Sequence, residues 1–288
     1  MTTIADTYFS GERPLYESRD LQLTRITIGE GESGLKESRH IEAADCRFEG
    51  KYVLWECDDV TCRNCYFASS DRAPMWYVRN LRLYDCLIDA PKAFREVDHI
   101  TLERVKMTDG EEAFWYCRDG EIAGLRMENG TYAFMHSRDL AIRDMNLAGK
   151  YTFQYARNIA IRNAVIDTKD AFWESDNCTI YDSEIHGEYL AWYSRNLRLV
   201  RCHISGTQPL CYCDNLVLED CTFAPDADLA FEYSSVQASI LSPVTSIKNP
   251  RSGHISCCGC GELLRDEHAK APNDCVIQSS RTYAQRIV

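Results

Sequence analysis

Apolar residues recur along the chain in pairs separated by one polar position, and the same arrangement returns about every twenty residues. In the unit that starts at Ser194, the first pair is Leu197 and Leu199. The second pair, Cys202 and Ile204, follows after two further residues. Alternation with a period of two is typical of strands that bury one face. The pattern therefore predicts two short strands in each unit, offset by a bend.

A third apolar position, third from the end of most units, follows a polar link. It is filled by Leu54, Met75, Phe94, Phe114, Phe134, Phe153, Phe172, Leu210 and Phe231. The units begin at Ser18, Ser38, Cys57, Val78, Val97, Cys117, Ser137, Ala156, Ser175, Ser194 and Cys213. A regular period of this length indicates stacked units that bury one another's faces. The fold predicted is all-β, a single-stranded right-handed parallel β-helix of about eleven coils with three strands per coil. Equivalent strands of successive coils are expected to pair at a spacing of roughly 4.8 Å.

Leucine-rich repeats share this period, but their LxxLxLxxN signature is missing and no unit contains a helical run. The third position of each unit supports the β-helix instead. It reads Asp20, His40, Asp59, Asn80, His99, Asp119, Asp139, Asn158, Asn177, Asn196 and Asn215. Asp and Asn tolerate left-handed backbone, and stacked Asn side chains form amide ladders. This column predicts a turn at the same place in every coil.

The repeat predicts a single domain, because 288 residues at 45% hydrophobic composition can bury one long core. Residues 18–233 are expected to form the β-helix. Residues 1–17 precede the first unit and are expected to form an N-terminal cap, since a solenoid needs its ends covered. The period is lost after Tyr233, and residues 234–288 are expected to form a C-terminal cap and tail.

The charge balance narrows the class of partner. The chain has 44 acidic and 32 basic residues, for a net charge of −12. Nucleic acids and anionic membranes need a basic face, so neither is expected as a partner. No apolar run approaches the roughly 18 residues of a membrane span, and the first residues do not resemble a signal peptide. The sequence predicts a cytoplasmic protein, with a homo-oligomer compatible with the long repeat.

Fifteen cysteines raise the question of disulfides or metal. Most of them occupy inward positions of the repeat, where other coils place Val, Met, Ala or Ser, so we expect small buried packing residues. The CxxC of Cys62 and Cys65 is interpreted as two inward positions of one coil. The tail contains His254, Cys257, Cys258, Cys260, His268 and Cys275 outside the repeat. CCxC is not a usual zinc spacing, and no metal or other cofactor is predicted.

Two columns at the end of each unit are not explained by core packing. The penultimate position contains all five tryptophans, and the last position alternates mainly between Tyr and Glu. Aromatic platforms next to carboxylates and cations suit a sugar chain, because ring faces stack on sugars and charged groups bond to hydroxyls. The alternative is structural, since cross-strand aromatic pairs also stabilise neighbouring coils.

The candidate site is centred on the coil that contains Asp170 and Glu174, which are the predicted catalytic residues. A carboxylate set among aromatic rings is expected to be partly desolvated, which suits general acid catalysis. The predicted ligand-binding residues are Lys169, Trp173 and Trp192, with Arg95 and Trp115 at the far edge. The function predicted is binding of an oligosaccharide or other sugar ligand, and the sequence leaves open whether a hydrolase or lyase activity accompanies it. The alternative is a non-catalytic scaffold that binds proteins.

Short motifs distributed over nearly the whole chain add a family resemblance. They are GERPL at Gly11, LKES at Leu35, FRE at Phe94, DAFWE at Asp170, GEYLAWYS at Gly187, QPLCY at Gln208, LAFEYS at Leu229 and IKNPRSG at Ile247. With these motifs the chain resembles a bacterial family of unknown function, number 3737. The resemblance implies a pectin-lyase-like right-handed parallel β-helix and brings no established activity. The clustered Asp residues of pectate lyases and polygalacturonases have no equivalent here.

Overall fold

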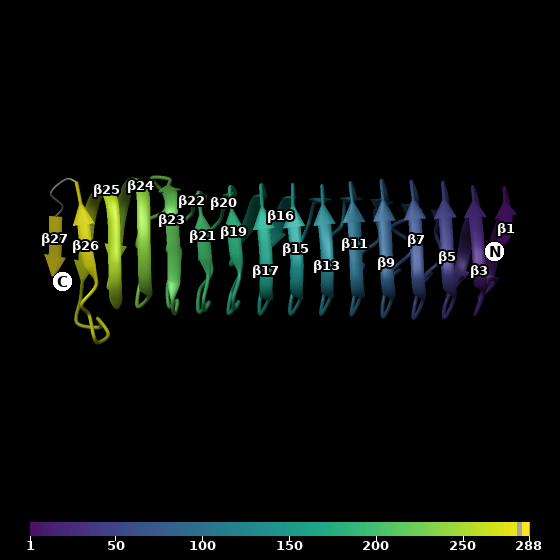
Figure 1. The fold of residues 1–288 in the computed structure, drawn as a ribbon, viewed down its shortest axis with the longest axis horizontal. Helices are drawn as coiled ribbons and strands as arrows, with labels where there is room; N and C mark the ends of the chain where they lie inside the picture. Colours follow the sequence, from purple (N-terminus) through teal and green to yellow (C-terminus); the bar gives the residue numbers. More distant parts are fainter. Residues whose placement is uncertain (281–283, 288) are drawn as a thin grey trace. The chain divides into compact units, whose positions relative to one another are not determined.

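The computed structural model describes residues 1–280 and 284–287 and shows an all-β protein (Figure 1). The chain divides into two compact units, Met1–Gly149 and Lys150–Val288. Each unit is described by itself below. Within the described residues, no helix has the length and apolarity that a membrane span requires.

The first unit contains two parallel sheets, and each coil adds one strand to each sheet. The strands of the first sheet are β1 (Thr2–Ala5), β3 (Arg19–Thr24), β5 (Arg39–Ala44), β7 (Asp58–Arg63), β9 (Arg79–Tyr84), β11 (Asp98–Glu103), β13 (Arg118–Ala123) and β15 (Arg138–Arg143). Those of the second sheet are β2 (Tyr8–Glu12), β4 (Thr27–Glu32), β6 (Arg47–Phe48), β8 (Tyr66–Phe67), β10 (Leu87–Ile88), β12 (Lys106–Met107), β14 (Arg126–Met127) and β16 (Asn146–Lys150), which ends at the unit boundary. Equivalent inward residues pair in register, as Leu21 with Ile41 and Ile41 with Val60.

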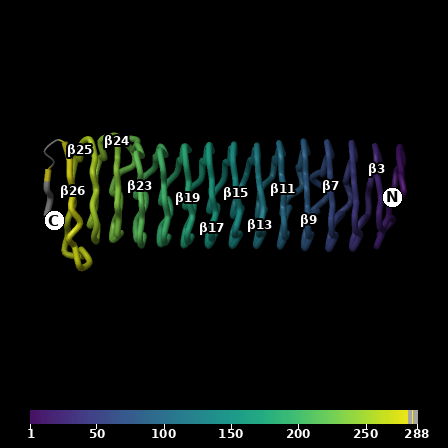
Figure 2. The backbone as a smooth tube through the Cα atoms, viewed as in Figure 1, coloured from purple at the N-terminus to yellow at the C-terminus, as the bar shows by residue number. Residues whose placement is uncertain are grey.

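The second unit repeats this arrangement with longer strands toward the C-terminus. The strands of its first sheet are β17 (Arg157–Arg162), β19 (Thr179–Tyr181), β21 (Arg198–Val200), β23 (Leu216–Phe223), β24 (Ser235–Lys248), β25 (Ser252–Arg265), β26 (Val276–Ser279) and β27 (Ala284–Ile287). Those of its second sheet are β18 (Val165–Lys169), β20 (Glu184–His186) and β22 (His203–Ser205), and β22 pairs with the end of β23. Both β26 and β27 pair with β25. The tube view follows the same successive coils (Figure 2).

The structure confirms a parallel β-solenoid and gives about 15 turns over the two units, where the sequence predicted about eleven. The difference comes from the ends. Strands β1 and β2 pair in parallel with β3 and β4, although residues 1–17 lack the full repeat pattern. Strands β24 and β25 pair in the same way beyond residue 233. Backbone pairing thus continues where the apolar pattern becomes irregular. The right-handed winding of the coils and the capping roles of the two ends stay predictions.

The prediction of a third strand in each coil is wrong. The segment that leads from the second-sheet strand of one coil to the first-sheet strand of the next consists of turns, and isolated bridges join it to neighbouring coils. We call this segment the turn face. Its inward residues form stacks in the core: the ring centroids of Phe114 lie 4.5 Å from those of Phe94 and 4.3 Å from those of Phe134. Alternate residues of the turn face have φ near +60°, as at Phe114 and Tyr116. A regular strand does not tolerate left-handed backbone at every second residue.

The column of polar residues at the third position of each unit has the predicted left-handed backbone, but most of its members lie inside strands of the first sheet, as Asn158 does in β17, so the prediction of a separate turn is wrong for those coils. Its members have left-handed backbone, with φ of 54° at Asn158 and Asn177. The amide ladder is present in part: Asn177 Nδ2 donates to Asn158 Oδ1 at 2.8 Å, and Asn215 Nδ2 donates to Asn196 Oδ1 at 2.8 Å. Asn196 itself donates to the carboxylate of Asp176. The residue types thus fit the backbone that each coil requires.

The repeat cysteines are buried, as expected, and among the described residues Cys258 is the one exposed thiol. Burial raises the pKa of Cys117 to about 12 and contributes most to raising that of Cys213 to about 11. A thiol must be accessible and ionised to react quickly. We therefore expect a bulky thiol reagent at pH 8 to modify one cysteine per native chain and all of them after denaturation. The Cys258→Ser variant should show no rapid phase, and rapid native labelling of Cys86 or Cys202 would contradict the prediction.

Candidate functional site

Two columns of outward side chains follow the turn face. The indole column, at the penultimate repeat position, contains Trp55, Trp76, Arg95 and Trp115 in the first unit, and Gln154, Trp173 and Trp192 in the second. The left-handed column lies three residues before the penultimate position of a unit, and φ is between 51° and 60° at its members Tyr52, Ala73, Lys92, Glu112 and Tyr132 in the first unit, and Tyr151, Asp170, Tyr189 and Gln208 in the second.

Most tryptophans of the indole column bind the next coil through a hydrogen bond that the sequence did not reveal. Trp55 Nε1 donates to the carbonyl of Ala73, and Trp76 Nε1 to that of Lys92, both at 2.7 Å. The same bond recurs from Trp115 to Tyr132 at 2.7 Å and from Trp192 to Gln208 at 2.8 Å. Each acceptor is the left-handed residue one coil on. These indole groups therefore hold adjacent coils together, which supports the structural interpretation of the column.

The ring faces within the first unit are covered by their neighbours. Trp55 and Trp76 stack with centroids 5.3 Å apart and planes 10° apart. The guanidinium of Arg95 lies 4.1 Å from the ring of Trp76 and 4.6 Å from that of Trp115. A cation held between two indoles is stabilised by both ring quadrupoles. A sugar therefore cannot stack between these coils.

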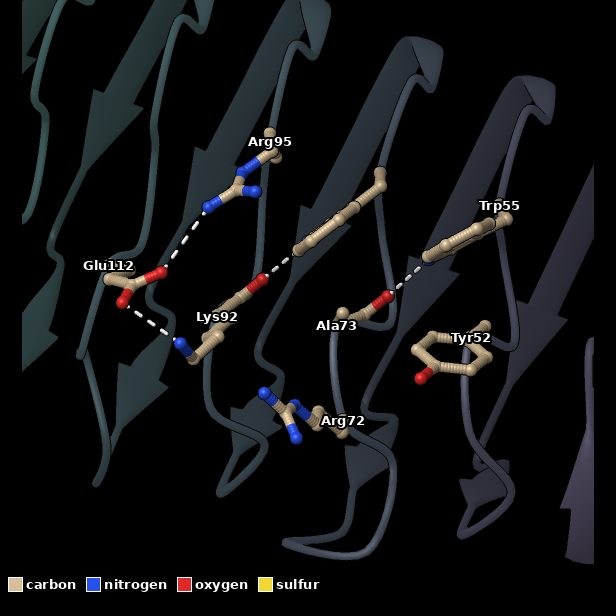
Figure 3. Close-up of a pocket in the computed structure, with 8 residues that line it drawn as sticks. Tyr52, Trp55, Arg72, Ala73, Lys92, Arg95 and Glu112 are labelled. Atoms are coloured by element: carbon tan, nitrogen blue, oxygen red, sulfur yellow. Dashed lines mark hydrogen bonds and ion pairs between the residues drawn. The ribbon is translucent and has the colours of Figure 1, made fainter.

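A pocket of about 370 Å³ opens below these rings in the first unit. Tyr52 and Trp55 border it on one coil, Arg72, Ala73 and Trp76 on the next, and Lys92 on a third (Figure 3). The coil that contains Ala73 runs over residues 57–77, a unit of 21 residues where most units have 19 or 20. Ala73 is also the smallest residue of the left-handed column. The longer unit and its alanine are the sequence signals that could have located this pocket.

The pocket carries an excess of positive charge. Lys92 Nζ and Arg95 Nη2 both bind the carboxylate of Glu112, at 2.8 Å and 3.3 Å. Arg72 is exposed, and its guanidinium has no hydrogen bond or ion pair to the residues that the structure describes. Three cations and one carboxylate thus line the pocket, in a chain whose net charge is −12. The pocket is the cationic recess of an acidic protein, which favours an anionic ligand.

The predicted site in the second unit is only partly assembled. Glu174 is exposed and accepts a hydrogen bond from Trp173 Nε1 at 3.3 Å, so its carboxylate is not desolvated by the surrounding rings. The ring centroid of Trp173 lies 5.6 Å from that of Trp192 and 5.3 Å from that of Tyr193. The aromatic cluster predicted around Glu174 is present, but the carboxylate lies at its surface.

Lys169 and Asp170 differ from one another in environment. Lys169 Nζ pairs with Glu188 at 3.2 Å and lies 5.0 Å from the ring of Tyr189. Asp170 is only 7% exposed, and burial raises its pKa. Asp170 therefore has the perturbation expected of a proton donor. Arg95 and Trp115, predicted at the far edge of this site, belong to the first unit.

The segment after β25 contacts Tyr212 and Tyr233, which occupy the last repeat position in the second unit. Lys270 Nζ lies 4.2 Å from the ring of Tyr233 and 5.8 Å from that of Tyr212. Desolvation, with Glu232 next in effect, raises the pKa of Tyr212. The rings of these two tyrosines are therefore contacted by another segment of the same chain.

A second recess, of about 390 Å³, lies at the bend between the two sheets of the second unit. Its charged groups bind one another: Arg201 holds Asp182 through two hydrogen bonds of 2.6 Å and 2.9 Å. His203 Nδ1 lies 2.9 Å from Thr222 Oγ1. Across residues 1–280 and 284–287, no group of three or more His, Cys, Asp or Glu side chains is arranged to hold a metal ion.

Comparisons with known proteins were made for sequence and structure. A family model described as "Protein of unknown function (DUF3737)" matches residues 2–278. None of the curated proteins compared with the chain matches it.

Similar solved structures share little sequence with this chain. QnrB1, a plasmid-mediated fluoroquinolone resistance protein, is 12% identical with a TM-score of 0.24, over 82% of this chain and 92% of that one. HetL, a pentapeptide repeat protein from the cyanobacterium Nostoc, is 11% identical with a TM-score of 0.22, over 73% and 83%. The tailspike protein gp49 from Pseudomonas phage LKA1 is 11% identical with a TM-score of 0.26, over 99% and 48%.

Proposed function

The chain belongs to the DUF3737 family of proteins of unknown function, and we propose that it binds a carbohydrate-like ligand in the turn-face pocket. The observation that carries this proposal is the pocket itself, a recess of about 370 Å³ with indole and phenol edges and convergent charged groups. Small-molecule sites are usually concave, largely apolar and supplied with a few polar groups of this kind. Sugars need both features, apolar edges for their C–H faces and charged donors for their hydroxyls.

Lys92 is the residue that tests this function most directly. We expect the full chain to bind oligosaccharides in a glycan array, and the Lys92→Ala variant to bind at least tenfold more weakly. Loss of one charge-assisted hydrogen bond costs about 1.5–3 kcal/mol, which corresponds to a factor of ten or more. The matched control is Lys106→Ala, which removes a lysine of the same unit that pairs with Glu128 outside the pocket.

An array on which no oligosaccharide binds the full chain would contradict the proposed function. Unchanged affinity in Lys92→Ala would place carbohydrate binding elsewhere on the protein.

We extend the proposal to catalysis in the second unit, with Asp170 as proton donor, Glu174 as its carboxylate partner, and Lys169, Trp173 and Trp192 as ligand contacts. The raised pKa of Asp170 supports this role, because an acid that stays protonated at higher pH can donate a proton. Any saccharide turnover by the full chain should fall at least a hundredfold in Asp170→Asn and in Glu174→Gln. Turnover that is unchanged in both variants would show that Asp170 and Glu174 have no catalytic role.

The second candidate function is a non-catalytic scaffold that binds another protein. It is favoured by the indole hydrogen bonds, which use the tryptophan N–H groups within the fold. A scaffold without a sugar site would keep its melting temperature in every saccharide tested.

A further inference from the structure

Tyrosines of the left-handed column pack against the tryptophan three residues ahead. The ring of Tyr52 lies 4.6 Å from that of Trp55, with an angle of 48° between the planes. In the second unit, Tyr189 lies 5.0 Å from Trp192 at 64°. A close ring contact therefore forms in two separate coils with the same residue spacing. A ring at this position is a regular element of the turn face wherever tyrosine precedes tryptophan by three residues.

Trp76 lacks this partner, because Ala73 stands where the tyrosine would be. The backbone is the same in both cases, with φ of 56° at Ala73 and 59° at Tyr52. The gap is therefore caused by the missing side chain and not by a change of chain path. Figure 3 shows the ring of Tyr52 next to Trp55 and no comparable group at Ala73. The pocket is the space that a six-membered ring would fill.

The charge next to this space indicates what the ring should carry. Arg72 directly precedes Ala73 and extends toward the coil of Lys92 (Figure 3). Lys92 Nζ pairs with the carboxylate of Glu112, whereas the guanidinium of Arg72 has no hydrogen bond or ion pair among the described residues. Guanidinium groups bind carboxylates and phosphates through paired hydrogen bonds. An anionic substituent is the group that would complete this arrangement.

We propose that a sugar ring bearing a carboxylate or phosphate occupies the place of the missing tyrosine ring beneath Trp76, with its anionic group between Arg72 and Lys92. This inference rests on the proposed carbohydrate-binding function and names its ligand class. The ring contacts Trp76 as Tyr52 contacts Trp55, and the excess positive charge of the pocket is neutralised on binding.

The Ala73→Tyr variant is the decisive test, because it supplies from the chain the ring that the ligand would provide. Tyrosine already occupies this backbone conformation at four other positions of the column, so the variant should fold with an unchanged melting temperature. Titration calorimetry with the full chain should show binding of glucuronate, glucose 6-phosphate or both, and at least tenfold weaker binding of glucose. Ala73→Tyr should lose binding of the anionic sugar entirely.

Two further variants separate the ring from the charge. Arg72→Gln should weaken the anionic sugar at least tenfold and leave glucose unchanged. Arg63→Gln is the matched control. Arg63 is the last residue of β7, outside the pocket, and its guanidinium lies 4.1 Å from the ring centroid of Tyr84. This variant should leave both affinities unchanged.

The outcomes distinguish this inference from the proposed function. Oligosaccharide binding that persists undiminished in Ala73→Tyr overturns the inference and leaves carbohydrate binding standing. Equal affinity for glucose and glucuronate, both lost in Ala73→Tyr, overturns the anionic assignment. Tighter binding of 4-hydroxybenzoate than of any sugar, also lost in Ala73→Tyr, overturns the sugar class. Absence of binding to every saccharide contradicts the proposed function itself.

Discussion

Replacing Phe114 by alanine is expected to lower the free energy of unfolding by about 3–5 kcal/mol. Phe114 is fully buried and stacks between Phe94 and Phe134, at 4.5 Å and 4.3 Å. The truncation removes the transfer free energy of the ring and leaves a cavity that both neighbours border. Because the flanking coils are fixed by ladder hydrogen bonds, the cavity cannot collapse easily. Urea unfolding followed by circular dichroism measures the change.

Two controls place the effect in the stack. Phe114→Leu keeps most of the volume and should cost less than half as much. Leu87→Ala removes a partly exposed side chain from β10 and should change stability by less than about 1 kcal/mol. A loss below about 1 kcal/mol for Phe114→Ala would show that the aromatic stack does not hold the core of the first unit.

Replacing Asp71 by asparagine is expected to stabilise the protein at neutral pH by about 1–3 kcal/mol. Asp71 is fully buried, and neither carboxyl oxygen has a hydrogen-bond partner among the described residues. Burial raises its pKa well above the ordinary value of 3.8, so the folded protein disfavours the ionised carboxylate. The folded state then binds more protons than the unfolded state once the pH exceeds about 4, and stability falls as the pH rises toward the folded pKa. Asparagine removes this loss.

The pH dependence provides the measurement. Urea unfolding should show the two proteins equally stable near pH 3.5 and the variant increasingly more stable up to pH 8. Asp89→Asn is the control at pH 7 and should be less stable than the parent, because the Asp89 carboxylate accepts hydrogen bonds from Tyr66 at 2.7 Å and Thr108 at 2.6 Å. A variant of Asp71 that is less stable than the parent at pH 7 would show that the carboxylate is satisfied in solution.

The two sheets could be predicted from the sequence because their signal is local. Pairs such as Leu197 and Leu199 alternate with polar residues, and burial of one sheet face requires this period. The turn face could not be predicted in the same way. Its inward phenylalanines recur once per coil, which fits a strand or a turn equally well. The left-handed backbone at these residues is imposed by coil closure and leaves no distinct residue pattern outside Asp and Asn.

The candidate site was placed where aromatic and acidic residues are densest, around Trp173 and Glu174. The pocket instead lies where a side chain is missing, at Ala73, and a small residue gives no positive signal in a search for functional groups. The tryptophans were correctly placed in one column. Their bonding to carbonyls could not be foreseen, because a backbone acceptor such as that of Lys92 is the same for every residue type.

The left-handed residues also bear on how the protein folds. The coil of residues 57–77 has positive φ at Asp59, Asn64, Ala73 and Tyr77, and each such residue costs up to about 1–2 kcal/mol in an isolated chain. Its ladder hydrogen bonds go to the coils on either side and not within the coil itself. An isolated coil would therefore have the free-energy cost of its left-handed residues without the ladder hydrogen bonds that offset this cost. Folding of each unit must begin with a nucleus of at least two coils and then propagate to successive neighbours, so that the first pairing sets the rate.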